Sequence, residues 1–225
     1  MYANDDADAW ELYPQLRFVY NKLWVASLND GLAYGPGGID VPRSGWYVIR
    51  PVVNVRGMGS CARIEHLEPQ CLEGVRNRAL KRVSPGSFWQ QYVPGNVMSV
   101  DYLLEDGLPI RFVEGFVLPG NRLGRFLMWR KLPLSMAPAL PEKLANALPH
   151  DGGTEPHAIN VEYIGGHIVE VHLRENPDPN RDMLLPVFAG DIGKEPPGDW
   201  VWIDDPDSAD DYTDNKRLGF WATRT

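Results

Sequence analysis

The sequence has few cysteines: Cys61 and Cys71 are the only two among 225 residues. Two thiols cannot build a disulfide framework, and they are too few for a cysteine-rich zinc site. The sequence also lacks any run of about 18 apolar residues, and its first ten residues have acidic side chains but no basic or apolar export signal. We therefore expect a soluble, cytoplasmic protein that makes no membrane contact.

Positive charge is also scarce, since the formal net charge is -8 at pH 7. Nucleic acid needs a clustered basic surface, so this balance excludes it as the main partner. Apolar residues make up 44% of the chain, and 22 Gly and 20 Pro indicate a loop-rich globular protein. Residues 1–225 are long enough for one catalytic unit.

The order of expected elements favours an α+β fold, because strands follow one another in hairpins rather than after helices. We expect helices over 15–28, 68–82 and 141–148. The expected strands are 46–55, 62–64, 88–93, 97–104, 110–117, 125–131, 159–164 and 168–174, and two short C-terminal strands at 199–203 and 218–222.

Chemistry-bearing side chains alternate along the strand predicted over 168–174. Period-2 geometry puts Glu170, His172 and Arg174 on one face and apolar residues on the other. This row could hold a divalent cation and an anion, because hard cations take oxygen ligands and arginine binds oxyanions. A solvated sheet face explains the strand equally well.

Hairpin register decides whether Glu162 joins this row. A two-residue Gly165-Gly166 loop would pair Glu162 with Val169, whereas a three-residue turn would pair it with Glu170. We predict the three-residue turn, and a Mg²⁺ ion between the two carboxylates, which would otherwise repel.

Arg50 precedes a glycine-containing loop formed by Arg56, Gly57, Met58, Gly59 and Ser60. Backbone N–H groups in such a loop can bind phosphate, and a cation on the preceding strand can reach the same group. Taken alone, the pattern is more often an ordinary hairpin turn.

Four segments occur in an order that resembles the ATP-grasp superfamily of carboxylate-amine ligases. They are NKLWVASL (21–28) with YGP (34–36), YVIRPVVNVRGMGS (47–60), WQQYVPG (89–95) with SVD (99–101), and NVEYI (160–164) with VEVHLR (169–174). The resemblance covers roughly residues 20–178. It implies an ATP-grasp-like α+β fold in which two lobes with antiparallel sheets enclose a nucleotide, here 20–93 and 94–178, followed by a C-terminal extension over 179–225.

The resemblance also implies roles for individual residues. Lys22, Arg50 and Arg174 would contact phosphate or substrate, and the glycine loop (56–60) would close over ATP. The adenine would lie along Gln90, Gln91, Tyr92 and Val93, with Asp101 on the next strand also near the nucleotide. Glu162, Glu170 and His172 would bind the metal.

Two positions depart from the family pattern. Arg50 stands in place of lysine and keeps the charge, which suits a phosphate contact. His172 stands in place of asparagine, and an imidazole favours Mn²⁺ over Mg²⁺ or leaves the metal to water. The family's usual N-terminal domain has no counterpart here, so we expect the C-terminal tail, a second copy or a partner subunit to help hold the acceptor.

The resemblance implies an ATP- and Mg²⁺-dependent ligase that activates a small-molecule carboxylate as an acyl phosphate for attack by an amine or a thiol. A nucleotide-binding module without turnover is the main alternative. A metal-dependent hydrolase built on His150, His157, His167 and His172 ranks lower, because His167 is expected on the opposite strand face from His172.

Overall fold

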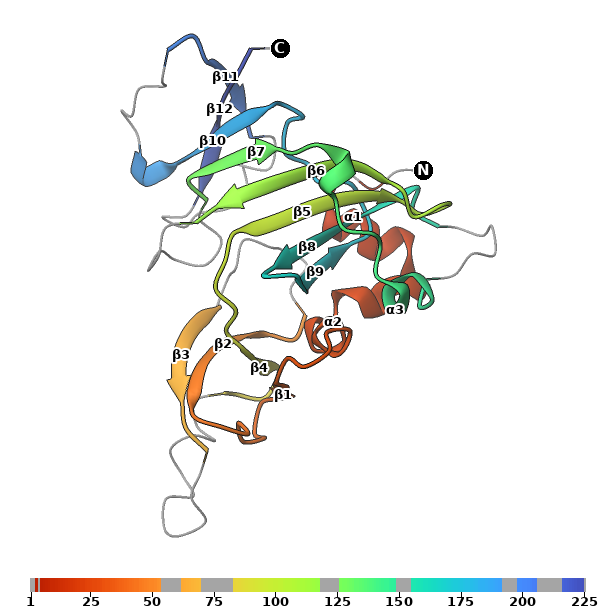
Figure 1. Ribbon diagram of the computed structural model, residues 1–225, viewed down its shortest axis with the longest axis vertical. Coiled ribbons are helices and arrows are strands. Elements are labelled where there is room, and N and C mark those ends of the chain that lie inside the picture. The colour runs from red at the N-terminus through yellow and green to blue at the C-terminus, as the bar shows by residue number, and fades with distance from the viewer. Residues whose placement is uncertain are drawn as a thin grey trace.

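The computed structural model describes residues 3, 5–53, 62–69, 83–117, 126–148, 155–191, 198–205 and 216–224. Within these ranges the chain forms two antiparallel sheets and a few short helices (Figure 1), which confirms the predicted α+β class. None of the helices in this part of the chain is long and apolar enough to cross a membrane.

The larger sheet contains eight strands in the order β11-β12-β10-β7-β6-β5-β8-β9, each antiparallel to its neighbours. Its strands are β5 (Val97–Leu103), β6 (Pro109–Phe116), β7 (Met128–Lys131), β8 (Ala158–Ile164), β9 (His167–His172), β10 (Met183–Phe188), β11 (Val201–Asp204) and β12 (Arg217–Ala222). The C-terminal extension therefore adds three strands to one edge of this sheet.

The smaller sheet contains four strands in the order β1-β4-β2-β3. They are β1 (Tyr34–Pro36), β2 (Gly45–Pro51), β3 (Arg63–Leu67) and β4 (Ser87–Gln91). Residues 92–96 connect this sheet to β5 of the larger one (Figure 1).

Short helices flank the sheets. They are α1 (Asp6–Leu12), α2 (Lys22–Ser27) and α3 (Glu142–Ala145), with 3-10 helices at Pro14–Tyr20, Leu134–Met136 and Ala189–Asp191. Alternating residues of the larger sheet pack beneath the first two helices. The buried residues of this core include Val100, Tyr102, Ile159, Val161, Val171 and Leu173. By alternation, the opposite face of these strands carries the polar residues Ser99, Asp101, Asn160 and Glu162, together with Val97 and Ile164 of a second core.

The single helix expected over 15–28 is wrong. Pro14–Tyr20 is a 3-10 helix, and α2 begins only at Lys22. Asn21 separates them, because its side chain accepts hydrogen bonds from the backbone N–H groups of Leu23 and Trp24 and so caps α2. The cap therefore places Lys22 at the first position of α2.

Most expected strands occur within a few residues of their predicted bounds, whereas β1 and β10 were not predicted. The sequence did not indicate β10 because it contains Pro186, and proline cannot donate a hydrogen bond to a neighbouring strand. It is tolerated because β7 pairs only with Met183 and Leu184, so Pro186 lies beyond that ladder. The helix expected over 68–82 falls almost entirely outside the described residues.

The β8–β9 hairpin achieves the predicted pairing of Glu162 with Glu170 by a different route. Its turn has two residues, Gly165 and Gly166, so the expected three-residue turn is wrong. Val169 is the extra residue of a β-bulge, and this bulge restores the register that a two-residue turn would otherwise shift.

Both turn glycines have positive φ angles, +56° at Gly165 and +82° at Gly166, but only Gly165 is crowded. A Cβ at Gly165 would lie 2.5 Å from Cγ1 of Val93, whereas a Cβ at Gly166 would meet nothing within 4 Å. We expect Gly166→Ala to cost about 1 kcal/mol of unfolding free energy from backbone strain, and Gly165→Ala to cost about 3 kcal/mol. Urea denaturation of both variants measures the difference, and equal losses would contradict the described packing.

Candidate functional site

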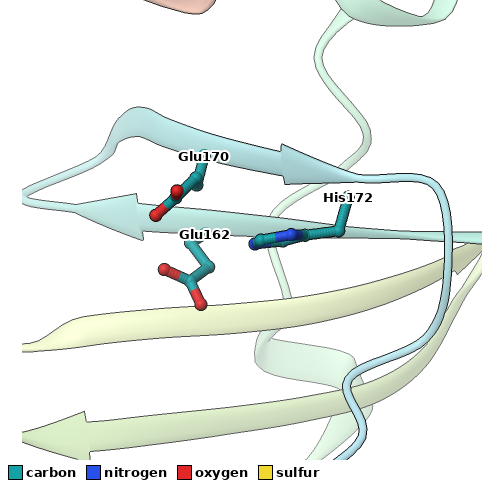
Figure 2. Close-up of side chains that lie close together, drawn as sticks. All are labelled: Glu162, Glu170 and His172. Atoms are coloured by element: carbon teal, nitrogen blue, oxygen red, sulfur yellow. The ribbon is translucent and has the colours of Figure 1, made fainter. Parts of the chain in front are cut away.

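Three side chains from the β8–β9 hairpin converge on the polar face of the larger sheet. Glu162, Glu170 and His172 each place one potential ligand atom within 4.8 Å of the others (Figure 2). Two carboxylates and an imidazole are a donor set that divalent cations accept. The residues therefore fit the metal that the sequence resemblance implies.

The two glutamates differ in protonation because their neighbours differ. Burial raises the pKa of Glu162, and the adjacent charge of Glu170 raises it further. Burial also acts to raise the pKa of Glu170, but the positive charges of Lys22, His172 and Arg50 outweigh it and hold that pKa below its usual range. In the metal-free site Glu170 is the ionised partner.

Lys22 reaches the site from the start of α2. Its backbone N–H donates to the carbonyl of Val52, which ties α2 to the end of β2, and its side chain is only 8% exposed. The ammonium forms an ion pair and hydrogen bond with Glu170. Lys22 therefore neutralises one carboxylate of the opposed pair.

Arg50 brings a second cation from the smaller sheet. Its guanidinium donates to the side-chain oxygen of Gln90 at 2.9 Å and to the carbonyl of Val169 at 2.9 Å. Val169 is the bulge residue, so its carbonyl is available to a group outside the sheet. Arg50 thus joins the two sheets beside Glu170.

Asp6, at the first turn of α1, is a site residue that the sequence analysis missed. Its carboxylate contacts Nδ1 of His172 at 2.9 Å and accepts a hydrogen bond from Arg174 at 2.9 Å. Although burial opposes ionisation, the charges of His172 and Arg174 lower the pKa of Asp6 to about 2. The only signal in the sequence was the Asp5-Asp6 pair, in which Asp5 caps the helix and Asp6 turns inward.

The cluster is rich in cationic side chains although the whole chain carries a net charge of -8. The permanent cations Lys22, Arg50 and Arg174 lie with Asp6 and Glu170, the two carboxylates whose pKa values are lowered. Nε of Arg50 and Nε of Arg174 are buried without a hydrogen-bond partner among the described residues. A divalent cation would make the cluster positive and suited to a polyanion.

The residues expected near adenine lie in and after β4. Gln90 is buried and contacts Arg50, while the side chain of Gln91 accepts a hydrogen bond from Arg43. Tyr92 and Val93 belong to the connection between the sheets, and Val93 approaches the β8–β9 turn. Whether these residues bind a nucleotide stays a prediction.

The remaining expected site residues are not part of the cluster as the structure describes it. Asp101 accepts hydrogen bonds from the side chain of Asn160 and the backbone of Asn176, not from the metal-site residues. The glycine loop (Arg56, Gly57, Met58, Gly59 and Ser60) lies outside the described residues, as does His150. Of the histidines in the described ranges, His172 is the one in a metal-compatible group, which disfavours the four-histidine hydrolase.

No protein-family model and no curated protein matches the sequence. Among solved structures, an L-amino acid ligase from Bacillus licheniformis is 12% identical, with a TM-score of 0.37, over 76% of this chain and 40% of that one. The ATP-grasp ligase PsnB, complexed with a phosphomimetic variant of its minimal precursor, Mg and ADP, is 17% identical, with a TM-score of 0.41, over 73% and 53%.

The D-alanine–D-alanine ligase from Bacillus anthracis is 9% identical, with a TM-score of 0.30, over 76% of this chain and 56% of that one. This chain therefore spans between 40% and 56% of the length of these three proteins. All three are described as ligases, and PsnB is described as an ATP-grasp ligase.

Asp6 offers a direct test of the cluster in the metal-free protein. Because its folded pKa of about 2 lies below the ordinary 3.8, its ionisation stabilises the fold above that ordinary value, and this contribution is lost as the pH falls through 2. We expect Asp6→Asn to lose about 2 kcal/mol of unfolding free energy at pH 7 and roughly half of that at pH 3. Urea denaturation in EDTA measures both values, with the exposed Asp8→Asn as control. A loss that does not depend on pH would show that the Asp6 charge is unimportant.

Proposed function

We propose that this protein binds ATP together with a divalent cation and uses it to activate a carboxylate for ligation to an amine or a similar nucleophile. The observation that carries this proposal is the convergence of Glu162, Glu170 and His172 within 4.8 Å, with Lys22 and Arg50 beside them. A cation site flanked by permanent positive charges suits a metal-bound polyphosphate better than a neutral ligand.

The metal would be held by Glu162, Glu170 and His172, and it would neutralise charge on the phosphate oxygens. Lys22 now pairs with Glu170, and its flexible side chain can turn to phosphate once the metal takes that carboxylate oxygen. The rigid guanidinium of Arg50 is held by Gln90 and Val169, so it contributes a fixed positive charge.

In the proposed reaction, a carboxylate oxygen of the substrate forms a bond to the γ-phosphorus of ATP. The bond from that phosphorus to the bridging oxygen breaks, and ADP leaves with the electron pair. An amine nitrogen then attacks the carbonyl carbon of the acyl phosphate, inorganic phosphate leaves, and the nitrogen gives up a proton. The protein accelerates these steps by positioning the reactants and neutralising charge.

A nucleotide-binding module without turnover is the second candidate, and the histidine at 172, where the resembled family has asparagine, favours it. Phosphate release that depends on an added carboxylate and amine distinguishes a ligase from such a module. The small-molecule substrates, and a second copy or partner subunit that completes the acceptor site, are part of the proposal.

The first experiment is calorimetric titration of ATP into the protein with Mg²⁺, with Mn²⁺ and without metal. Because Glu170 is the ionised carboxylate of the cluster, we expect Glu170→Gln to weaken metal-dependent ATP binding at least tenfold, or about 1.4 kcal/mol. Glu105→Gln, an exposed change of the same chemistry in the β5–β6 turn, should leave the affinity unchanged. Absence of ATP binding to the folded wild-type protein under all three conditions would refute the proposal.

A further inference from the structure

We propose that the Glu162–Glu170–His172 site selects a transition-metal divalent cation over Mg²⁺, and that Asp6 is the positioning residue that presents His172 to it. This inference rests on the metal site of the proposed function and goes further, because it names the class of metal and a residue outside the ligand set. Both parts follow from contacts between α1 and the end of β9.

Asp6 holds the imidazole by one of its two nitrogens. Nδ1 of His172 lies 2.9 Å from Oδ2 and 3.1 Å from Oδ1 of Asp6, whose side chain is only 8% exposed. Arg174 donates to Oδ2 at 2.9 Å, and the hydroxyl of Tyr20 donates to Oδ1 at 3.4 Å. The carboxylate is therefore held by partners on several sides, and it fixes the orientation of the ring.

With Nδ1 engaged by Asp6, Nε2 is the nitrogen left to bind a metal, and the metal would take the place of the proton on Nε2. Figure 2 shows the imidazole reaching toward Glu162 and Glu170 with the end of the ring that is farthest from the backbone. A carboxylate that accepts from the inner nitrogen while the outer nitrogen binds metal is a common outer-sphere arrangement, and it increases the basicity of the ligand. The same contact leaves the imidazole little freedom to turn away.

A nitrogen ligand discriminates among divalent cations, whereas charge alone does not. Lys22 pairs with Glu170, and Arg50 lies beside it, so both repel every divalent cation to a similar extent. The bond to imidazole strengthens from Mn²⁺ to Co²⁺ and the later ions, and it contributes least for Mg²⁺, which prefers oxygen. The cationic neighbours thus weaken all metals, and His172 restores affinity only for those that accept nitrogen.

The contact between Asp6 and His172 depends on the tertiary fold. Asp6 and His172 are 166 residues apart, and the N-terminal helix supplies the contact. Asp6 does not belong to the cluster of potential ligand atoms. Its effect on metal binding must therefore pass through the orientation and basicity of His172.

The test uses the full-length metal-free protein without nucleotide, titrated calorimetrically with Mg²⁺, Mn²⁺ and Co²⁺. We expect the wild type to bind Co²⁺ at least about a hundredfold more tightly than Mg²⁺, with Mn²⁺ between them. His172→Asn should weaken Co²⁺ binding by at least about tenfold, leave Mg²⁺ binding within a few-fold, and alter the visible absorption spectrum of the Co²⁺ complex.

Asp6→Asn should weaken Co²⁺ binding by about 10- to 100-fold with a much smaller effect on Mg²⁺, which a general loss of structure would not produce. His167→Asn on the same strand and Asp8→Asn on the same helix are the matched controls, and both should leave the metal preference unchanged. If Asp6→Asn does not fold, the His172→Asn comparison decides the metal preference, and Asp6→Glu, which keeps the carboxylate, decides the positioning role by retaining the preference.

Equal losses for Mg²⁺, Mn²⁺ and Co²⁺ in the His172 variant, or no metal binding by the wild type, would overturn the inference. Failure of this inference can be distinguished from failure of the proposed function. Mg²⁺-dependent ATP binding without a preference for Co²⁺ would refute only the inference. A His172-dependent preference for Co²⁺ in a protein that does not bind ATP would support the inference and refute the nucleotide proposal.

Discussion

Repulsion between Glu162 and Glu170 is the constraint on which the arrangement of this site depends. The two carboxylates are paired directly across adjacent strands, where like charges destabilise a sheet. Cationic side chains from two separate elements offset this repulsion, namely Lys22 from α2 and Arg50 from β2. Stability of the fold alone explains such opposed carboxylates and their counter-charges poorly. The arrangement is well suited to a cation that binds reversibly.

The same counter-charges connect the parts of the fold. Arg50 spans from the smaller sheet to the carbonyl of Val169, and this carbonyl is accessible because the bulge disrupts the ladder between β8 and β9. Helix α2 packs against β9 of the larger sheet and β1 of the smaller one. Lys22 and Arg50 therefore contribute both to the site and to the contact between the two sheets. A ligand that displaces either side chain would alter the site and that contact together.

The N-terminal helix belongs to the site as much as the hairpin does. Asp6 offsets the charges of His172 and Arg174, and these two residues alternate with buried Leu173 at the end of the hairpin. Burial of an aspartate beside two cationic side chains is costly unless all three are paired, and here they are. These contacts order the polar side chains from Glu170 in β9 to Arg174 just after it.

Local pattern alone determined much of this protein: the α+β class, most strands, and the common face of Glu170, His172 and Arg174, because alternation along a strand is a short-range property. Tertiary structure decided the rest. The bulge at Val169 corrected a register that turn length alone would have shifted, and Asn21 divided a predicted helix so that Lys22 begins α2. Asp6 joined His172 across 166 residues, a contact that depends on packing of α1 and that no periodicity in a single sequence encodes.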